Sequence, residues 1–266
     1  MRIKGLLLDI DGVLVDAGRA VPGGPEALRA LASEGIPYRL VSNSSQRSRR
    51  ALAMRLQSMG YSVDTEEIFT PAVAAARFLV SKRASAYLAV REEAKEDFQE
   101  VGVREDDRRP RYVVLGDMGE DVTYGRLNRI LRFLLGGSQL IALGRTRIWR
   151  APDGPALDVG AFVALFEEAT GKQAIVFGKP EPRMFEEAAH SMRLKLEDVA
   201  MVGDDADVDV AAAKRAGAGL GVLVRTGKYR PGDESRYSPP PDEVRDSFPE
   251  FVNHFLSAVR SAAGGP

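Results

Sequence analysis

The chain of 266 residues contains no cysteine and only two histidines, His190 and His254. The lack of cysteine excludes disulfides, thiolate zinc sites and a cysteine nucleophile. With so few histidines, a histidine-rich metal site and a histidine-based catalytic triad are not expected. Reactive groups must therefore come mainly from carboxylates, hydroxyls and amines.

The sequence also lacks a strong excess of one charge and any long apolar run. Its formal net charge is -1 at pH 7, whereas nucleic-acid binders usually carry a strongly basic face. No uninterrupted apolar stretch approaches the roughly 18 residues of a membrane span, and the first residues lack the pattern of a signal peptide. We therefore expect a cytoplasmic protein with no nucleic-acid or membrane partner.

Apolar runs alternate with helical patterns along nearly the whole chain. "IKGLLLDI" precedes a predicted helix at 24–33, and "VAMVGDD" precedes the helical pattern "DVDVAAAKRAG". Near-continuous aliphatic runs separated by helices are typical of a parallel sheet that is covered on both faces. The predicted fold class is therefore α/β, with a doubly wound parallel sheet.

The middle of the chain repeats this alternation, with "ASAYLAVR", "RYVVLGD" and "QLIALG" as expected strands. About a hundred residues with their own strands and helices are enough for a domain. We predict a core of residues 1–71 plus 173–266 and an inserted, smaller α/β cap domain at 72–172. A single longer sheet would give a similar periodicity, so that alternative stays open.

Two carboxylates, Asp9 and Asp11, lie two positions apart at the end of the first apolar run. If the strand continues through both, their side chains share a face and repel each other. A cation, a bound proton or a task that needs both groups must offset this repulsion.

Three more segments place polar residues where an apolar run ends. They are "YRLVSNSS" with Ser42, Asn43 and Ser44, "AIVFGKPEP" with Lys179, and "VAMVGDDADVD" with Asp204, Asp205 and Asp209. Ligands bind at the carboxyl ends of strands in open parallel sheets. We therefore expect four strands to deliver polar residues to one edge of the sheet.

These residue types suit one chemistry when they occur together. Oxygen ligands from Asp9, Asp204 and a backbone carbonyl suit Mg²⁺, which would also offset the repulsion between carboxylates. Ser42 and Lys179 are donors for phosphoryl oxygens, and one carboxylate could act as nucleophile while another acts as general acid and base. Each motif alone also fits a solvated turn or a helix cap, but their order favours phosphoryl transfer through an aspartyl-phosphate.

In that order, "DIDGVL", "VSNSS", "GKPEP" and "GDDADVDVAAAKRAG" resemble the four motifs of haloacid dehalogenase superfamily phosphatases, over nearly the whole chain. The long insertion between the second and third motifs resembles the NagD and nitrophenyl-phosphatase subgroup, which has an α/β cap on a Rossmann-like core. "SNSSQRSRR", "ALDVGAF" and "VRTGKYRPGDE" resemble the branch that contains phospholysine phosphohistidine inorganic pyrophosphate phosphatase.

The resemblance implies a catalytic role or a metal-binding role for five acidic residues. Asp9 would be the nucleophile. Asp11 would be the general acid and base, and its main-chain carbonyl would bind Mg²⁺ together with the carboxylates of Asp9 and Asp204. Asp205 and Asp209 would support the metal site.

Four further residues would bind the substrate. The resemblance implies that Ser42 and Lys179 hold the transferring phosphoryl group and that Asn43 and Ser44 shape its pocket. The cap would select the substrate, and a homodimer is compatible with the resemblance. In the expected cap, "GRTRIWR" at 144–150 fits a solvated strand face better than a substrate-contacting loop.

The expected function is a Mg²⁺-dependent phosphatase of small phosphorylated metabolites. A phosphotransferase or mutase is one alternative, because the same groups could pass the phosphoryl group to an acceptor other than water. A non-catalytic phosphate-binding protein is another, although four retained reactive residues, Asp9, Asp11, Lys179 and Asp204, argue against it.

Overall fold

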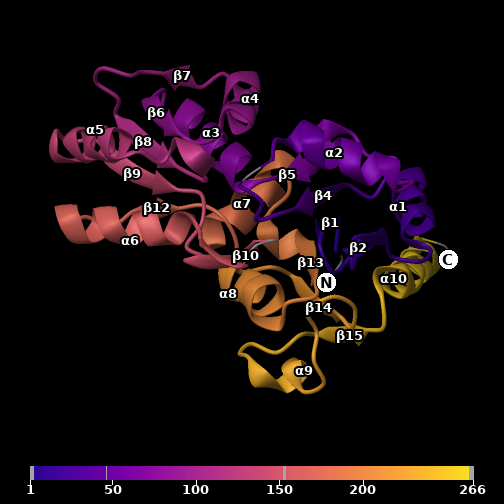
Figure 1. Ribbon diagram of the computed structural model, residues 1–266. Coiled ribbons are helices and arrows are strands. Elements are labelled where there is room, and N and C mark those ends of the chain that lie inside the picture. Colours follow the sequence, from indigo (N-terminus) through magenta and orange to yellow (C-terminus); the bar gives the residue numbers. More distant parts are fainter. Residues whose placement is uncertain (1–2, 46, 152–153, 264–266) are drawn as a thin grey trace. The chain divides into compact units, whose positions relative to one another are not determined.

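The computed structural model of the protein describes residues 3–45, 47–151 and 154–263 (Figure 1). The chain divides into two compact units. The first unit comprises Met1–Ser42, Arg50–Phe69 and Lys179–Pro266, and the second comprises Asn43–Arg49 and Thr70–Gly178. The predicted division into a catalytic core and a cap stays a prediction.

A six-stranded parallel sheet forms the centre of the first unit, with strand order β15-β14-β13-β1-β4-β5. Its strands are β1 (Gly5–Asp9), β4 (Tyr38–Val41), β5 (Ile68–Phe69), β13 (Val199–Gly203), β14 (Leu220–Val224) and β15 (Glu243–Arg245). A small antiparallel pair, β2 (Val15–Asp16) and β3 (Arg19–Ala20), follows β1. The predicted α/β fold class with a parallel, Rossmann-like core is confirmed.

Helices cover both faces of this sheet. The helices of this unit are α1 (Gly24–Ser33), α2 (Arg49–Ser58), α7 (Pro182–Ser191), α8 (Ala212–Ala216), α9 (Asp233–Arg236) and α10 (Phe248–Ala263), with the short η1 (Thr65–Glu67), η3 (Leu196–Asp198) and the π-helical η4 (Ala206–Ala211). Leu6 and Leu8 share a face of β1, and both join Leu28 of α1 and Phe251 of α10 in one hydrophobic cluster. Figure 1 shows α7 and α8 on the other side of the strands.

The second unit has its own five-stranded parallel sheet, with strand order β12-β9-β8-β6-β7. Its strands are β6 (Ser85–Ala89), β7 (Arg104–Glu105), β8 (Tyr112–Leu115), β9 (Gln139–Ala142) and β12 (Ile175–Val176), with a separate hairpin of β10 (Ile148–Ala151) and β11 (Gly154–Leu157). Its helices are α3 (Pro71–Ser81), α4 (Glu92–Val101), η2 (Gly119–Asp121), α5 (Tyr124–Leu135) and α6 (Val159–Thr170). Because the parallel strands form two separate sheets, the alternative of one longer sheet is wrong.

The strand before Lys179 belongs to the second sheet. β12 pairs in parallel with β9, through Ile175↔Ile141 and Val176↔Ala142. The expectation that four strands of one sheet deliver the polar motifs is therefore wrong for this segment, and Lys179 instead begins the stretch with which the chain returns to the first unit. A short apolar run reports that a strand is buried but not which sheet it joins.

Among the described residues, no helix is both long enough and apolar enough to span a membrane.

Candidate active site

Parallel pairing places three polar residues at neighbouring strand ends in the first unit. Asp9 is the last residue of β1, and β1 lies between β13 and β4 in the sheet, with Leu8 opposite Val202 and Asp9 opposite Val41. Ser42 directly follows β4, and Asp204 directly follows β13. All three side chains are buried, at 7%, 4% and 1% exposure for Asp9, Ser42 and Asp204.

A cluster of buried carboxylates lies at these strand ends. Asp9, Asp204 and Asp209 each offer an oxygen, and these oxygens lie within 4.8 Å of one another. Asp209 comes from η4, whose chain can approach β13 closely because residue 203 is glycine. A Cβ atom at Gly203 would lie 2.3 Å from the Cβ of Asp209, well inside normal contact distance.

One ammonium group lies among these carboxylates. The Nζ of Lys179 is 2.6 Å from Oδ1 of Asp9 and 2.8 Å from Oδ1 of Asp209, and the lysine side chain is only 4% exposed. Burial lowers the pKa of Lys179, but the charges of Asp209 and Asp9 outweigh it and leave that pKa above its ordinary value. Lys179 is therefore a fixed positive charge inside the cluster.

The cluster nevertheless carries more negative charge than Lys179 neutralises. Burial raises the pKa of Asp9 well above its ordinary value, the charge of Asp209 raises it further, and Lys179 only partly opposes this. Burial also raises the pKa of Asp204 to about 6, in spite of a hydrogen bond from the backbone N–H of Lys228. The carboxylates therefore favour a further cation or a bound proton.

A divalent metal ion fits this arrangement. Oδ1 of Asp204 is buried and has no hydrogen-bond partner among the described residues. A buried polar atom without a partner is costly, and oxygen-only ligands suit a hard cation. The three buried carboxylates could thus hold a metal. Asp209, predicted only to support the site, belongs to this cluster directly.

A loop that sequence reasoning missed holds Asp204 in place. The backbone N–H of Lys228 donates to Oδ2 of Asp204 at 2.7 Å, and the hydroxyl of Thr226 donates to the carbonyl of Gly12. Gly12 and Gly227 both have positive φ, and a Cβ atom there would lie 1.9 Å and 2.1 Å from Oδ2 of Asp204. "RTGK" follows the end of β14, so the rule about strand ends could have found it.

Asp11 lies in a different environment from Asp9. Its side chain is 62% exposed, and its Oδ1 accepts hydrogen bonds from both terminal nitrogens of Arg55, at 3.2 and 3.1 Å. β1 ends at Asp9, and the chain turns at Gly12, so the alternation rule for strands does not extend to Asp11. The expectation that the two carboxylates share a strand face is therefore wrong, whereas the role of Asp11 stays a prediction.

Asp205 acts locally as a helix cap. Its Oδ1 accepts the backbone N–H groups of Asp207 and Val208, at 3.2 and 3.0 Å, and thus satisfies free donors at the start of η4. Its Oδ2 lies 3.5 Å from Nζ of Lys228.

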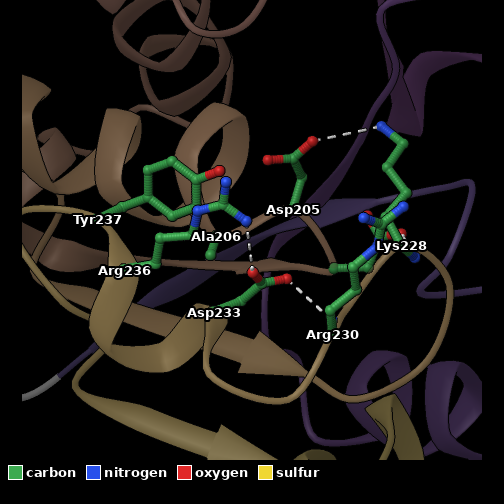
Figure 2. Close-up of a pocket in the computed structure, with 8 residues that line it drawn as sticks. Asp205, Ala206, Lys228, Arg230, Asp233, Arg236 and Tyr237 are labelled. Carbon is green, nitrogen blue, oxygen red and sulfur yellow. Dashed lines mark hydrogen bonds and ion pairs between the residues drawn. The ribbon is translucent and has the colours of Figure 1, made fainter.

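Figure 2 shows the cavity beside Asp205, where the carboxylates of Asp205 and Asp233 face cationic side chains. Its volume is about 240 Å³, and it is lined by Asp204, Asp205, Ala206, Lys228, Arg230, Asp233, Arg236 and Tyr237. Because Asp204 contributes both to this cavity and to the carboxylate cluster, the cavity opens next to the candidate metal site.

The remaining predicted residues fall into two groups. Asn43 is exposed and Ser44 is half-buried, and both belong to the second unit, so their association with Asp9 stays a prediction. The side chains of Trp149 and Arg150, in the arginine-rich segment considered above, lie outside the described part of the structure.

Comparisons with known proteins match the chain along most of its length. A family model described as haloacid dehalogenase-like hydrolase matches residues 6–104, and a HAD-hydrolase-like model matches residues 176–251. The chain is 39% identical to human "Haloacid dehalogenase-like hydrolase domain-containing protein 2", over 96% of each chain. It is 36% identical to the Danio rerio "Phospholysine phosphohistidine inorganic pyrophosphate phosphatase", over 96% of this chain and 95% of that one.

Solved structures with a similar fold also match the chain. The p-nitrophenyl phosphatase from Archaeoglobus fulgidus matches with a TM-score of 0.85 and 34% identity, covering 96% of this chain and 100% of that one. NagD from E. coli K-12 matches with a TM-score of 0.85 and 27% identity, covering 94% and 98%. The similarity thus extends through both units.

Proposed function

The chain belongs to the haloacid dehalogenase-like hydrolases and is a phosphatase of that family, and we propose that it hydrolyses small phosphorylated metabolites through an aspartyl-phosphate on Asp9, with Mg²⁺ as cofactor. The observation that carries this proposal is the buried Asp9 carboxylate at 2.6 Å from Lys179, inside a cluster with surplus negative charge. The predicted family resemblance is confirmed.

In the first half of the proposed reaction, an oxygen of Asp9 attacks phosphorus. The new bond joins that oxygen to phosphorus, and the bond from phosphorus to the leaving oxygen breaks. Lys179 favours this step because its charge lowers the pKa of Asp9, against the effect of burial, and so favours the ionised carboxylate. Asp11 protonates the leaving oxygen, for which its carboxyl group must leave Arg55.

In the second half, water attacks the phosphorus of the aspartyl-phosphate. Asp11, now without its proton, takes a proton from that water and returns to its starting form. Phosphate leaves, and Asp9 is regenerated as a carboxylate. Lys179 and Ser42 hold the phosphoryl oxygens by hydrogen bonds, and Asn43 and Ser44 are proposed to complete that pocket.

The carboxylates of Asp9 and Asp204 and the main-chain carbonyl of Asp11 are the proposed Mg²⁺ ligands, with Asp209 and Asp205 in support. The ion would offset the negative charge of the transferring phosphoryl group. The unpartnered Oδ1 of Asp204 supports this assignment.

The segment 72–172 is proposed to act as a cap that excludes water and selects the substrate. The cytoplasmic location and a homodimer stay predictions.

The decisive experiment measures phosphate release from a panel of phosphorylated metabolites, with Mg²⁺ or with EDTA. We expect metal-dependent turnover that falls by more than about 1,000-fold in Asp9→Asn, because the nucleophile is lost. Asp16→Asn, at an exposed position of the same unit, is the matched control and keeps its activity. Turnover that survives in Asp9→Asn contradicts the proposal.

The same panel separates the two alternatives. Phosphate transfer that requires an added alcohol or sugar acceptor identifies a phosphotransferase. Binding of phosphate by the folded protein, without turnover of any substrate, identifies a phosphate-binding protein.

A further inference from the structure

A second cavity, unrelated to the carboxylate cluster, lies within the second unit. Its volume is about 580 Å³, and it is lined by Arg108, Arg109, Pro110, Arg132, Phe133, Gly136, Gly137 and Ser138. Three of these residues carry a positive charge and none carries a negative charge. This volume is within the range of small-molecule sites.

Hydrogen bonds fix the backbone on one side of this cavity. Oδ1 of Asp106 accepts the backbone N–H groups of Arg108 and Arg109, at 2.9 and 3.0 Å. This carboxylate is therefore engaged by the turn that carries the two arginines. The hydroxyl of Ser138 donates to the carbonyl of Pro110 at 2.6 Å, which joins this turn to the segment that follows α5.

A further contact joins the same turn to α5 itself. Arg129 donates to the backbone carbonyl of Asp107 at 2.6 Å, and it also reaches the carboxylate of Asp107 at 3.2 Å. Arg129 lies one helical turn before Arg132, whose side chain lines the cavity. The two walls are thus held together, and the charge of Asp107 is already paired.

The three arginines of the cavity differ from others in the same unit. The arginines there that form ion pairs include Arg49 with Asp97, Arg91 with Asp117, Arg126 with Asp121, Arg129 with Asp107, and Arg145 with Glu167. Within the described ranges, Arg108, Arg109 and Arg132 have no such partner. Three exposed guanidinium groups without an ion-pair partner around one cavity create a positive local potential.

We propose that this cavity, which we call the arginine cavity, binds a small oligophosphate. The planar guanidinium group donates two parallel hydrogen bonds that match phosphate oxygens, and three such groups match a ligand with several phosphoryl charges. A single arginine at the surface needs no explanation beyond its solvation. A cation at Arg132 is also favoured by the negative end of the helix dipole at the C-terminus of α5. Neither explains why Arg108 and Arg109, from a different segment, line the same space.

Calorimetric titration of the full-length protein with inorganic tripolyphosphate, in EDTA, tests this proposal. We expect one bound ligand per chain and an affinity that falls with added salt. In the triple variant Arg108→Ala, Arg109→Ala and Arg132→Ala, the affinity falls at least tenfold. The matched control is Lys82→Ala, Arg83→Ala and Arg147→Ala, which removes three exposed charges of the same unit without touching the arginine cavity.

Unchanged affinity in the arginine variant overturns the proposal, because the ligand then binds elsewhere. Absence of binding to the natural protein at millimolar tripolyphosphate also overturns it. The single variant Arg132→Gln provides a second measurement if the triple variant does not fold, and its affinity is expected to fall severalfold. Comparison with ATP identifies the class of natural ligand. If ATP binds more tightly than tripolyphosphate and the arginine variant loses this binding, the arginine cavity is assigned to nucleotides. Equal affinities for ATP and tripolyphosphate assign it to inorganic oligophosphates.

Discussion

Each unit of this protein buries an aspartate whose pKa is raised to about 6, but the two are compensated very differently. In the second unit, Asp97 of α4 is 1% exposed, and burial raises its pKa. Both of its oxygens accept the backbone N–H of Arg49, and the Nε of Arg49 lies 3.4 Å from Oδ1. Asp97 therefore has a backbone donor and a cation beside it, and the same guanidinium group also lies 2.7 Å from Glu100.

In the first unit, Asp204 lies close to two other buried carboxylates, and the positive charge inside this cluster comes from one lysine. Lys179 contacts Asp9 and Asp209, while Oδ1 of Asp204 has no partner among the described residues. A buried carboxylate with a donor and a cation beside it is matched within the fold, whereas a surplus of buried negative charge favours a further cation or a bound proton. We propose that this contrast separates a structural carboxylate, Asp97, from a functional one, Asp204.

The pH dependence of stability tests the structural side of this comparison. Folded Asp97 has a pKa of about 6 against an ordinary value of 3.8, so between these values the folded state holds a proton that the unfolded state has lost. Stability contributed by this group is therefore present at low pH and is lost as the pH rises to about 6, by on the order of 3 kcal/mol.

The measurement is urea unfolding of the natural protein and of Asp97→Asn between pH 4 and pH 7. Asp97→Asn should lose less stability over this range, because asparagine does not titrate. Parallel curves for the two proteins would show that Asp97 is ionised at all these pH values and that Arg49 fully compensates its burial.

The close packing of Gly12 against Asp204 gives the second prediction. In Gly12→Ala, the new methyl group would lie 1.9 Å from Oδ2 of Asp204, so the carboxylate must move. A displacement of about 1 Å costs about 100-fold in rate, or about 2.7 kcal/mol. We expect phosphate release by Gly12→Ala to fall by at least about this factor.

Gly18→Ala is the matched control for backbone strain. Gly18 also has a positive φ, of 78°, but a Cβ atom there meets nothing within 4 Å. Equal losses of turnover in the two variants would mean that strain rather than contact with Asp204 limits the enzyme.

Sequence reasoning found Asp9, Lys179 and Asp204. The structure brings Asp9 and Asp204 together because the adjacent parallel strands β1 and β13 end side by side, whereas Lys179 reaches Asp9 from the stretch that follows β12 of the other sheet. Sequence reasoning failed for β12, because a short apolar run does not reveal which sheet it joins. It also failed for the orientation of Asp11, which depends on where β1 ends and on Arg55, 44 positions away in the chain. Long-range contacts of this kind leave no local pattern.

The contact of the loop after β14 with Asp204 was missed for a related reason. Thr226 and Gly227 follow β14, and their effect on Asp204 depends on the order of strands in the sheet. That order cannot be read from periodicity, since any parallel arrangement gives the same alternation. The local elements were therefore more predictable than their pairing.

The effect of Mg²⁺ on stability should distinguish Asp204, a proposed metal ligand, from Asp97, which lies in the other unit. A ligand that binds only the folded state raises stability by about 2.7 kcal/mol at one hundred times its Kd, and by about half of that at ten times. At ten times the Kd of Mg²⁺, we expect urea unfolding of the natural protein and of Asp97→Asn to show this gain. Asp204→Asn should lose the gain, and Asp205→Asn, which changes the capping residue outside the carboxylate cluster, should retain most of it.

The ion pair between Asp11 and Arg55 gives the smallest expected effect, because both side chains are accessible to water, with 62% and 27% exposure. Such pairs contribute about 0.2–1 kcal/mol. If Asp11 must leave Arg55 to protonate the leaving group, Arg55→Ala should raise the rate of phosphate release, by at most about fivefold. Arg55→Lys, which retains the charge, is the control, and its rate of phosphate release should lie between those of the natural protein and Arg55→Ala. A fall of more than tenfold in Arg55→Ala would instead mean that Arg55 holds Asp11 in its working position.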